Sequence, residues 1–168
     1  MNFDLEKFRS MTVKLPRFDD GRVDFTNAGY AFVLSCFIKF QNEILLLKRS
    51  NQVSTHQGKW HTVAGYIDEE IDLKAKALKE LNEEIGLTED LIDSFVFGEP
   101  YERLDSSVNR TWHVYPILAN LKTRPKITLD FEHTEYQWMQ LKNIDKLDLD
   151  LVPNFKLSLA KVMRSKYI

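Results

Sequence analysis

The sequence predicts an α+β fold in which helices lie on the faces of a mixed β-sheet. Runs of β-branched and aromatic residues recur along the chain between turn residues, which is the pattern of strands. Two other segments, near 72–85 and 154–164, carry apolar residues at the three- and four-residue spacing of a helix. Strands with helices interspersed indicate a mixed sheet covered by helices, and the length of 168 residues suits one domain.

The N-terminal region, residues 1–27, is expected to form an added β-hairpin. Apolar residues alternate with polar ones on both sides of Asp20-Gly21, a dipeptide typical of tight turns. The alternating residues are Met11, Val13 and Leu15 before the turn and Val23 and Phe25 after it. This region would therefore precede the main sheet as a separate addition.

The main sheet is expected to begin with the run 31–38, which is apolar almost throughout and predicts a strand covered on both faces. Gln41-Asn42 would turn the chain into the next strand, and residues 49–59 form a polar loop. The further strands are expected near 44–47, 60–63, 94–104, 110–121 and 135–139.

Two helices complete the expected fold. The first runs from about Asp72 to Ile85, because Gly86 is a natural C-terminal stop. The second lies near 154–164. Its apolar stripe consists of Phe155, Leu159, Val162 and Met163.

Composition and charge are those of a soluble globular protein. Hydrophobic residues make up 43% and charged residues 29%, a mixture that can bury a core without disulfides. The net charge of -2 argues against a partner that is a nucleic acid polymer. The single cysteine, Cys36, indicates a reducing compartment and is expected to be buried. No apolar stretch is long enough to span a membrane, so a cytoplasmic protein is expected.

Acidic residues concentrate in and just before the first predicted helix. The segment 68–84 holds seven acids and three lysines. Helical geometry places Glu80, Glu83 and Glu84 within one arc at the edge of the apolar stripe, where like charges repel. Three carboxylates in that position suit a hard divalent cation such as Mg²⁺, which takes oxygen ligands and leaves room for substrate phosphates. The alternative is a solvated acidic helix face.

The segment 65–87 resembles the Nudix box, G-x5-E-x7-R-E-U-x-E-E-x-G-U, where U is bulky and apolar. The matching residues are Gly65, Glu80, Leu81, Glu83, Glu84, Gly86 and Leu87. Two positions depart from the box: Ile71 replaces its first Glu, and Lys79 replaces its Arg. In the family that Glu commonly pairs with the Arg. The joint change therefore suggests a different support for the helix more than a lost metal site.

The resemblance implies the Nudix fold, a mixed sheet sandwiched between helices (α/β/α), over residues 28–168. It implies hydrolysis of the pyrophosphate in a nucleoside diphosphate linked to another moiety, or in a nucleoside triphosphate, by a metal-activated water. Mg²⁺ or Mn²⁺ would be held by Glu80, Glu83 and Glu84. Glu83 or Glu84 could also orient or deprotonate the water, and Gly65 would let the backbone approach the metal or phosphate.

Further site residues follow from the same resemblance. A glutamate from a loop late in the domain often acts as base or ligand. Glu132 is favoured over Glu135, with Glu102 as a third option. Phosphate contacts could come from Arg49, Arg103 and Arg110, or from Lys48 and Lys59. A base could stack on Trp60, or on Tyr66, Tyr101 and Trp112. Each of these residues could instead be a surface charge, an exposed loop acid or a packing aromatic.

Two other functions share the expected fold. A nucleotide-binding or sensor module without catalysis is the main alternative, and Ile71 is its best support. An isopentenyl-diphosphate isomerase uses a Cys near its active site, whereas Cys36 lies within an apolar strand. The expected partner is a small nucleotide or nucleoside diphosphate derivative, and homodimer formation is a further expectation.

Overall fold

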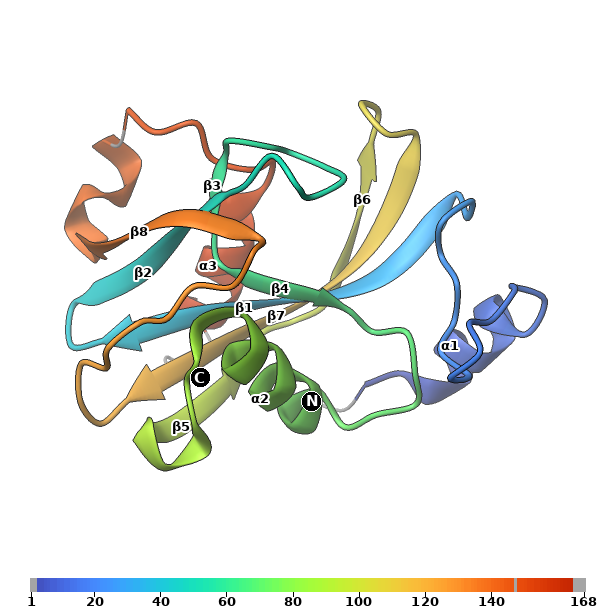
Figure 1. Cartoon of the computed structure of the whole chain (residues 1–168), viewed down its shortest axis with the longest axis horizontal. Coiled ribbons are helices and arrows are strands. Elements are labelled where there is room, and N and C mark those ends of the chain that lie inside the picture. Colours follow the sequence, from blue (N-terminus) through green and yellow to red (C-terminus); the bar gives the residue numbers. More distant parts are fainter. Residues whose placement is uncertain (1–2, 147, 165–168) are drawn as a thin grey trace.

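Two long strands, β1 (Tyr30–Phe40) and β7 (Arg110–Leu121), run side by side through the middle of the sheet. They pair in parallel from Tyr30 opposite Thr111 to Lys39 opposite Asn120. The other strands join by antiparallel pairing, so the computed structural model, which describes residues 3–146 and 148–164, confirms a mixed sheet (Figure 1). These strands are β2 (Glu43–Arg49), β3 (Trp60–His61), β4 (Val63–Tyr66), β5 (Ile92–Phe97), β6 (Tyr101–Asp105) and β8 (His133–Gln140).

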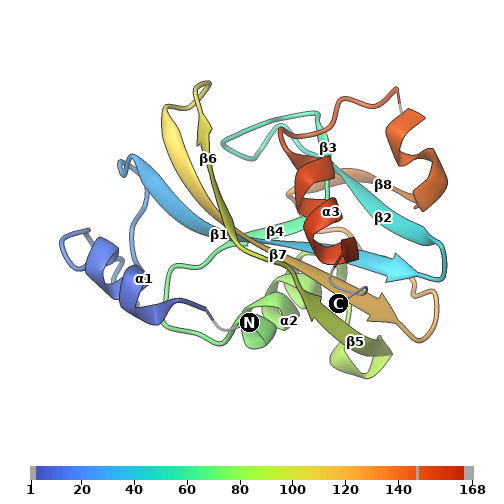
Figure 2. The same ribbon diagram turned by 180° about the vertical axis from the view of Figure 1, so that it is seen from behind.

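Helices cover both faces of this sheet, as Figures 1 and 2 show from opposite sides. α2 (Leu73–Ile85) packs in the larger hydrophobic core with Phe32 and Leu34 of β1. α3 (Phe155–Arg164) packs in a second core with Phe37 of the same strand. Because successive residues of a strand point to opposite faces, β1 contributes to both cores. The expected α/β/α arrangement is confirmed. Two short 3₁₀ helices, η1 (Glu89–Leu91) and η2 (Leu141–Lys146), follow α2 and β8.

The boundaries of α2 follow from its capping residues. The side chain of Asp72 accepts hydrogen bonds from the backbone N–H groups of Lys74 and Ala75, which have no partner within the helix. Gly86 adopts the left-handed conformation, with φ of 68°, and Leu87 N–H donates back to Leu81. The helix expected over 72–85 is therefore confirmed.

The N-terminal extension, residues 3–27, differs from the expected hairpin. Its first part is helix α1 (Leu5–Thr12), capped by the side chain of Asp4, so the strand expected around Met11 is wrong. Helical spacing buries Phe8, which packs with Phe3 and Phe32 in the larger core. This burial outweighs the local alternation. The turn at Asp20-Gly21 is present, but only one antiparallel bridge, Arg17 to Val23, flanks it.

A second difference concerns residues 94–104, for which the sequence predicts one strand. The chain instead forms β5 and β6, separated at Gly98. A Cβ at Gly98 would come within 3.0 Å of Pro116 and Val162, so the backbone here lies unusually close to β7 and α3. Cys36 is fully buried, as expected. No helix in the described part of the chain is long and apolar enough to cross a membrane.

Candidate functional site

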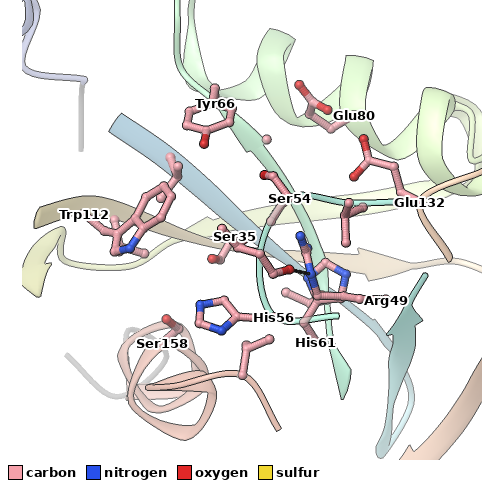
Figure 3. Close-up of a pocket in the computed structure, with 18 of the residues that line it drawn as sticks. Ser35, Arg49, Ser54, His56, His61, Tyr66, Glu80, Trp112, Glu132 and Ser158 are labelled. Carbon is pink, nitrogen blue, oxygen red and sulfur yellow. Dashed lines mark hydrogen bonds between the residues drawn. The ribbon is translucent and has the colours of Figure 1, made fainter. Parts of the chain in front are cut away.

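A cavity of about 710 Å³ opens between α2, the end of β2, the loop 50–59 and the loop before β8. Of the expected site residues, Gly65, Glu80 and Glu83 line it, together with Arg49, Arg103 and Glu132. In the view of Figure 3, Glu80 and Glu132 lie on one side of the cavity and Trp112 on the other. The cavity therefore combines an acidic wall, cationic side chains and aromatic rings.

Gly65 and Glu80 lie against each other at the acidic wall. β4 carries Gly65 opposite Leu34 of β1, and α2 carries Glu80 onto it. A Cβ at Gly65 would come within 2.7 Å of Glu80 Oε2, closer than real Cβ contacts. The missing side chain of Gly65 is therefore the space that the Glu80 carboxylate occupies. Sequence reasoning placed both residues at the site but did not predict this contact.

Glu84 lies behind this wall and is only 3% exposed. Its Oε1 accepts a weak hydrogen bond from the backbone N–H of Ala64 at 3.3 Å, and its Oε2 has no hydrogen-bond partner among the described residues. Burial, followed by the negative charges of Glu80 and Glu132, raises the pKa of Glu84 well above its usual value. A buried carboxylate oxygen without a hydrogen bond is costly, so Glu84 Oε2 is a strong candidate ligand for a cation.

Two histidines lie beside Glu84, but neither donates a hydrogen bond to its Oε2. His133 Nδ1 is 3.2 Å from Asp130 Oδ1, and its Nε2 is 2.8 Å from His61 Nε2 and 3.6 Å from Glu84 Oε2. Burial lowers the pKa of both histidines, so both are neutral at pH 7. If neutral His133 donates from Nδ1 to Asp130, its Nε2 can only accept, and His61 donates to it. Sequence spacing gave no signal for this pair.

Glu83 and Glu132 reach the cavity from different elements. Glu83 lies on the exposed side of α2. Glu132 is brought in by the pairing of β8 with β2, and its carbonyl accepts from the backbone N–H of Ser50. Burial and then the charge of Asp130 raise the pKa of Glu132, while Arg49 opposes them. Neither of the two other candidates lines the cavity: Glu135 pairs with Lys48, and Glu102 pairs with Lys7.

These carboxylates suit Mg²⁺ or Mn²⁺ by their chemistry. All their donors are oxygens, the ligands that hard divalent cations take. As the side chains lie, no three His, Cys, Asp or Glu residues of ranges 3–146 and 148–164 converge enough to enclose an ion. Mg²⁺ needs only one or two carboxylates when substrate phosphates and waters complete its shell. The residues present therefore fit such an ion.

The cationic side of the cavity is built on Arg49 and Arg103. Arg49 ends β2, and its Nε donates to the carbonyl of Thr55 at 2.9 Å, which fixes the guanidinium plane. Burial lowers its pKa, opposed by the charges of Glu132 and Glu84, but a guanidinium stays charged at neutral pH. Arg103 on β6 pairs with Asp105 at 3.0 Å.

Asp105 joins this strand to the loop 50–59. Its Oδ2 also lies 3.1 Å from His56 Nε2, and its Oδ1 accepts from the Ser107 hydroxyl. Burial opposes ionisation, but the hydrogen bonds from Ser107 and Arg103 outweigh it and lower the pKa of Asp105 to about 2. The ionised Asp105 therefore connects β6 with the loop 50–59 through its contacts with Arg103 and His56.

Two of the expected substrate contacts are not among the residues that line the cavity. Trp60 is buried in the second hydrophobic core, and its backbone pairs with Asp150 and Val152. Arg110 donates to the carbonyls of Phe25, Thr26 and Ala28, and its guanidinium lies over the Trp112 ring. Neither residue lines the cavity, so the structure does not bring them together with the acids.

The two departures from the box pattern also have defined places. Ile71 is partly buried and packs against the larger core. Lys79 lies 3.8 Å from Glu69, and both side chains are well exposed. The lysine that contacts the acidic wall is instead Lys76, whose Nζ lies 2.9 Å from Glu80. Its i,i+4 spacing from Glu80 was the only sequence signal for this pair.

Comparison with protein families gives a match to the NUDIX domain model over residues 30–161. The fold is similar to that of a MutT protein from Methanosarcina mazei, with a TM-score of 0.66 and 22% identity, covering 84% of this chain and 99% of that one. An Ap4A hydrolase from C. elegans gives a TM-score of 0.59 and 20% identity over 77% and 93% of the chains.

The NUDIX domain of NrtR from Shewanella oneidensis, crystallised with ADP ribose, gives a TM-score of 0.64 and 15% identity over 83% and 89%. Likeness at these identities describes the fold alone. Comparison with curated proteins gave no match.

Proposed function

The chain belongs to the Nudix family, and from this premise we propose that it is a metal-dependent pyrophosphohydrolase. Its substrate would be a nucleoside diphosphate linked to another moiety, or a nucleoside triphosphate. The observation that carries the proposal is one cavity in which carboxylates and a fixed guanidinium face a common space. A diphosphate with its counter-ions needs both signs of charge.

The acidic wall would hold Mg²⁺ or Mn²⁺ through Glu80, Glu83 and Glu84. Such an ion supplies, when bound, charge that offsets the phosphate oxygens and a lower pKa for water in its shell. Glu80 is already confined by Gly65, and Glu84 offers a buried oxygen without a partner among the described residues. Both features favour a cation ligand.

Other residues of this chain would bind the substrate and move its protons. Arg49 offers a guanidinium of fixed plane to phosphate oxygens, and Arg103 lies on the same cavity. Glu132 has a raised pKa, which suits a proton acceptor near neutral pH, and Glu83 is an alternative base. Trp112 and Tyr66, with ring centroids 6.1 Å apart, offer faces for a base.

The names of similar structures agree with a nucleotide substrate, because one was crystallised with ADP ribose and another is described as an Ap4A hydrolase. Trp60 and Arg110 are left out of the proposed site, because neither residue lines the cavity. Trp60 packs in the second core, and Arg110 binds backbone carbonyls while its guanidinium supports Tyr66 and Trp112. A homodimer and a cytoplasmic location stay predictions.

The test is a phosphate-release screen with a coupled phosphatase over nucleoside triphosphates, ADP-ribose, nucleotide sugars and dinucleoside polyphosphates. Wild type is assayed with Mg²⁺ and with excess EDTA, beside Glu83→Gln. Glu135→Gln is the matched control, because Glu135 is an exposed glutamate outside the cavity. We expect turnover by wild type and the control, and loss of turnover in EDTA and in Glu83→Gln. Full activity in EDTA would refute the metal-dependent mechanism.

A nucleotide-binding module without catalysis is the second candidate, favoured by the changed box positions at Ile71 and Lys79. It predicts no turnover by any variant together with a nucleotide-induced rise in melting temperature. The same samples measured by thermal denaturation therefore separate the two functions.

A further inference from the structure

Lys76 is a buried lysine of α2, next to the acidic residues of the cavity. Its residue is only 3% exposed, and its Nζ lies 2.9 Å from Glu80 Oε1 and 3.4 Å from Asp68 Oδ1. An ammonium group removed from water is strongly unfavourable unless anions surround it. Two carboxylates therefore hold Lys76 in place, and one of them belongs to the proposed metal site.

Asp68, the second partner of Lys76, is in turn bound by the N-terminal extension. Asp68 Oδ2 lies 3.1 Å from Arg22 Nη1, and the carbonyl of Asp68 accepts from the backbone N–H of Val23 at 2.7 Å. The charges thus alternate through Arg22, Asp68, Lys76 and Glu80. Because Arg22 pairs with Asp68, the ammonium of Lys76 is held between Asp68 and Glu80, and all four of these residues line the cavity.

Lys76 is also distinguished from its neighbour. Lys79, one turn further along α2, lies 3.8 Å from Glu69 at the surface, where water and salt screen its charge. Of these two lysines, only Lys76 forms a buried ion pair with one of the acids Glu80, Glu83 and Glu84.

We propose that Lys76 is the resident counter-ion of the acidic site: it neutralises Glu80 while no divalent cation is bound, and its charge limits how tightly such a cation binds. The proposal rests on the metal site of the proposed function. A cation paired with a ligand carboxylate stabilises that carboxylate when the site is empty and repels a second cation that approaches it. Stability without metal and affinity for metal should therefore change in opposite directions when Lys76 loses its charge.

The test compares Lys76→Met with Lys79→Met, a matched change on the same helix. Melting temperature is measured in EDTA, and Mn²⁺ affinity is measured without substrate from the EPR signal of the free ion. We expect Lys76→Met to melt at least about 5 °C lower in EDTA, because an uncompensated buried charge remains. We expect it to bind Mn²⁺ at least about tenfold more tightly. The Mn²⁺ affinity of Lys79→Met should stay within about threefold of that of wild type, because the charge of Lys79 is screened by water and salt.

Two further variants keep the test decisive. Lys76→Gln removes the charge but keeps a donor for Glu80, and it should also bind Mn²⁺ more tightly even if Lys76→Met does not fold in EDTA. In a Glu80→Gln background, Lys76→Met should strengthen Mn²⁺ binding much less, because its carboxylate partner is absent. Unchanged or weaker Mn²⁺ binding by both Lys76 variants would overturn the proposal while leaving the hydrolase assignment intact. Failure of wild type to bind Mn²⁺ without substrate would also overturn the proposal for Lys76, whereas the hydrolase assignment is decided separately by turnover with Mg²⁺ and with EDTA, where substrate phosphates can complete the shell of the ion.

Discussion

The Cα of Gly65 and the carboxylate of Glu80 occupy adjoining space, so that a side chain on one would displace the other. The contact joins a sheet strand to the acidic helix, two elements that the chain brings together across fifteen residues. It explains why the smallest residue begins the box segment in physical terms. The glycine supplies volume at this position and not a special backbone angle, since its φ is not positive.

Gly65→Ala tests this relationship. The new methyl group meets the flexible end of Glu80, so the carboxylate should move while the fold persists. We expect the free energy of unfolding to change by less than about 1 kcal/mol and kcat to fall at least about tenfold. Gly29→Ala is the control, because a Cβ there would meet no atom within 4 Å. Wild-type kcat in the Gly65→Ala variant would show that the position of Glu80 is unimportant.

Glu83→Gln and Glu84→Gln should separate activity from stability. Both are expected to lose at least about 100-fold in kcat, since metal and proton-transfer contributions reach that size. Glu83 is exposed, so its replacement should leave unfolding unchanged. Glu84 is buried without a hydrogen-bond partner for Oε2 among the described residues, so its replacement should stabilise the metal-free protein. Urea denaturation in EDTA measures the difference, and a destabilised Glu84→Gln would contradict it.

The stability of the metal-free protein should depend on pH in the way that the raised pKa of Glu84 predicts. Its folded pKa is raised above 4.5, so the folded state holds a proton that the unfolded state releases. Stability is then greatest below 4.5 for this group and falls as pH rises toward the folded pKa. Wild type in EDTA should lose stability over that range, and Glu84→Gln should lose less. Parallel pH profiles for the two proteins would rule out this origin.

Asp105 should give the opposite pH dependence, with stability that decreases as the pH falls into the acid range. Its pKa of about 2 lies below the ordinary 3.8, so its contribution is present above 3.8 and is lost as pH falls toward 2. Asp105→Asn should lower stability by about 2 kcal/mol at pH 7, with a gap that narrows below about pH 4. Asp93→Asn, at an exposed site on β5, serves as the control. A constant gap from neutral to acid pH would argue against the ionised side chain as its cause.

Restoring the box pattern should carry a stability cost. Ile71→Glu places a charge where an apolar side chain packs against the larger core, and about 1 kcal/mol of stability should be lost. Adding Lys79→Arg should recover little of it, because Lys79 lies at the surface near Glu69. Activity of the double variant, measured below its melting temperature, should be similar to or higher than that of wild type. Unchanged stability would show that Ile71 makes no useful contact.

Local patterns predicted most of the sheet and both large helices, because each signal was carried by neighbouring residues. The Asp72 and Gly86 caps, the apolar run of β1 and the stripe of α3 are examples. The N-terminal helix was missed because its short alternating pattern also fits a strand. The helix is favoured by the burial of Phe8 against Phe32, a contact between residues distant in sequence that a local pattern cannot show.

The sequence named several residues that line the cavity, both inside the box segment and outside it, as Arg49 and Glu132 show, but not how they contact one another. Glu80 and Gly65 were found from spacing, but their contact was not. Asp68 carried no local sign that it would share Lys76 with Glu80. Arg110 and Trp60 were expected at the site but do not line the cavity. The sequence pattern of a strand does not tell whether a charged or aromatic side chain faces a cavity or a core.

The hydrogen bonds of Arg110 to the carbonyls of residues 25, 26 and 28 join parts of the chain that are 82 to 85 positions apart. During synthesis, the extension therefore leaves the ribosome long before its anchor exists. Such distant contacts make folding slow, because loop closure precedes the gain from pairing. Glu132 and β8 are added later still. The contacts that Arg110 makes with the extension can thus form only after β7 has been made, and until then apolar side chains such as Phe25 lack part of their native surroundings.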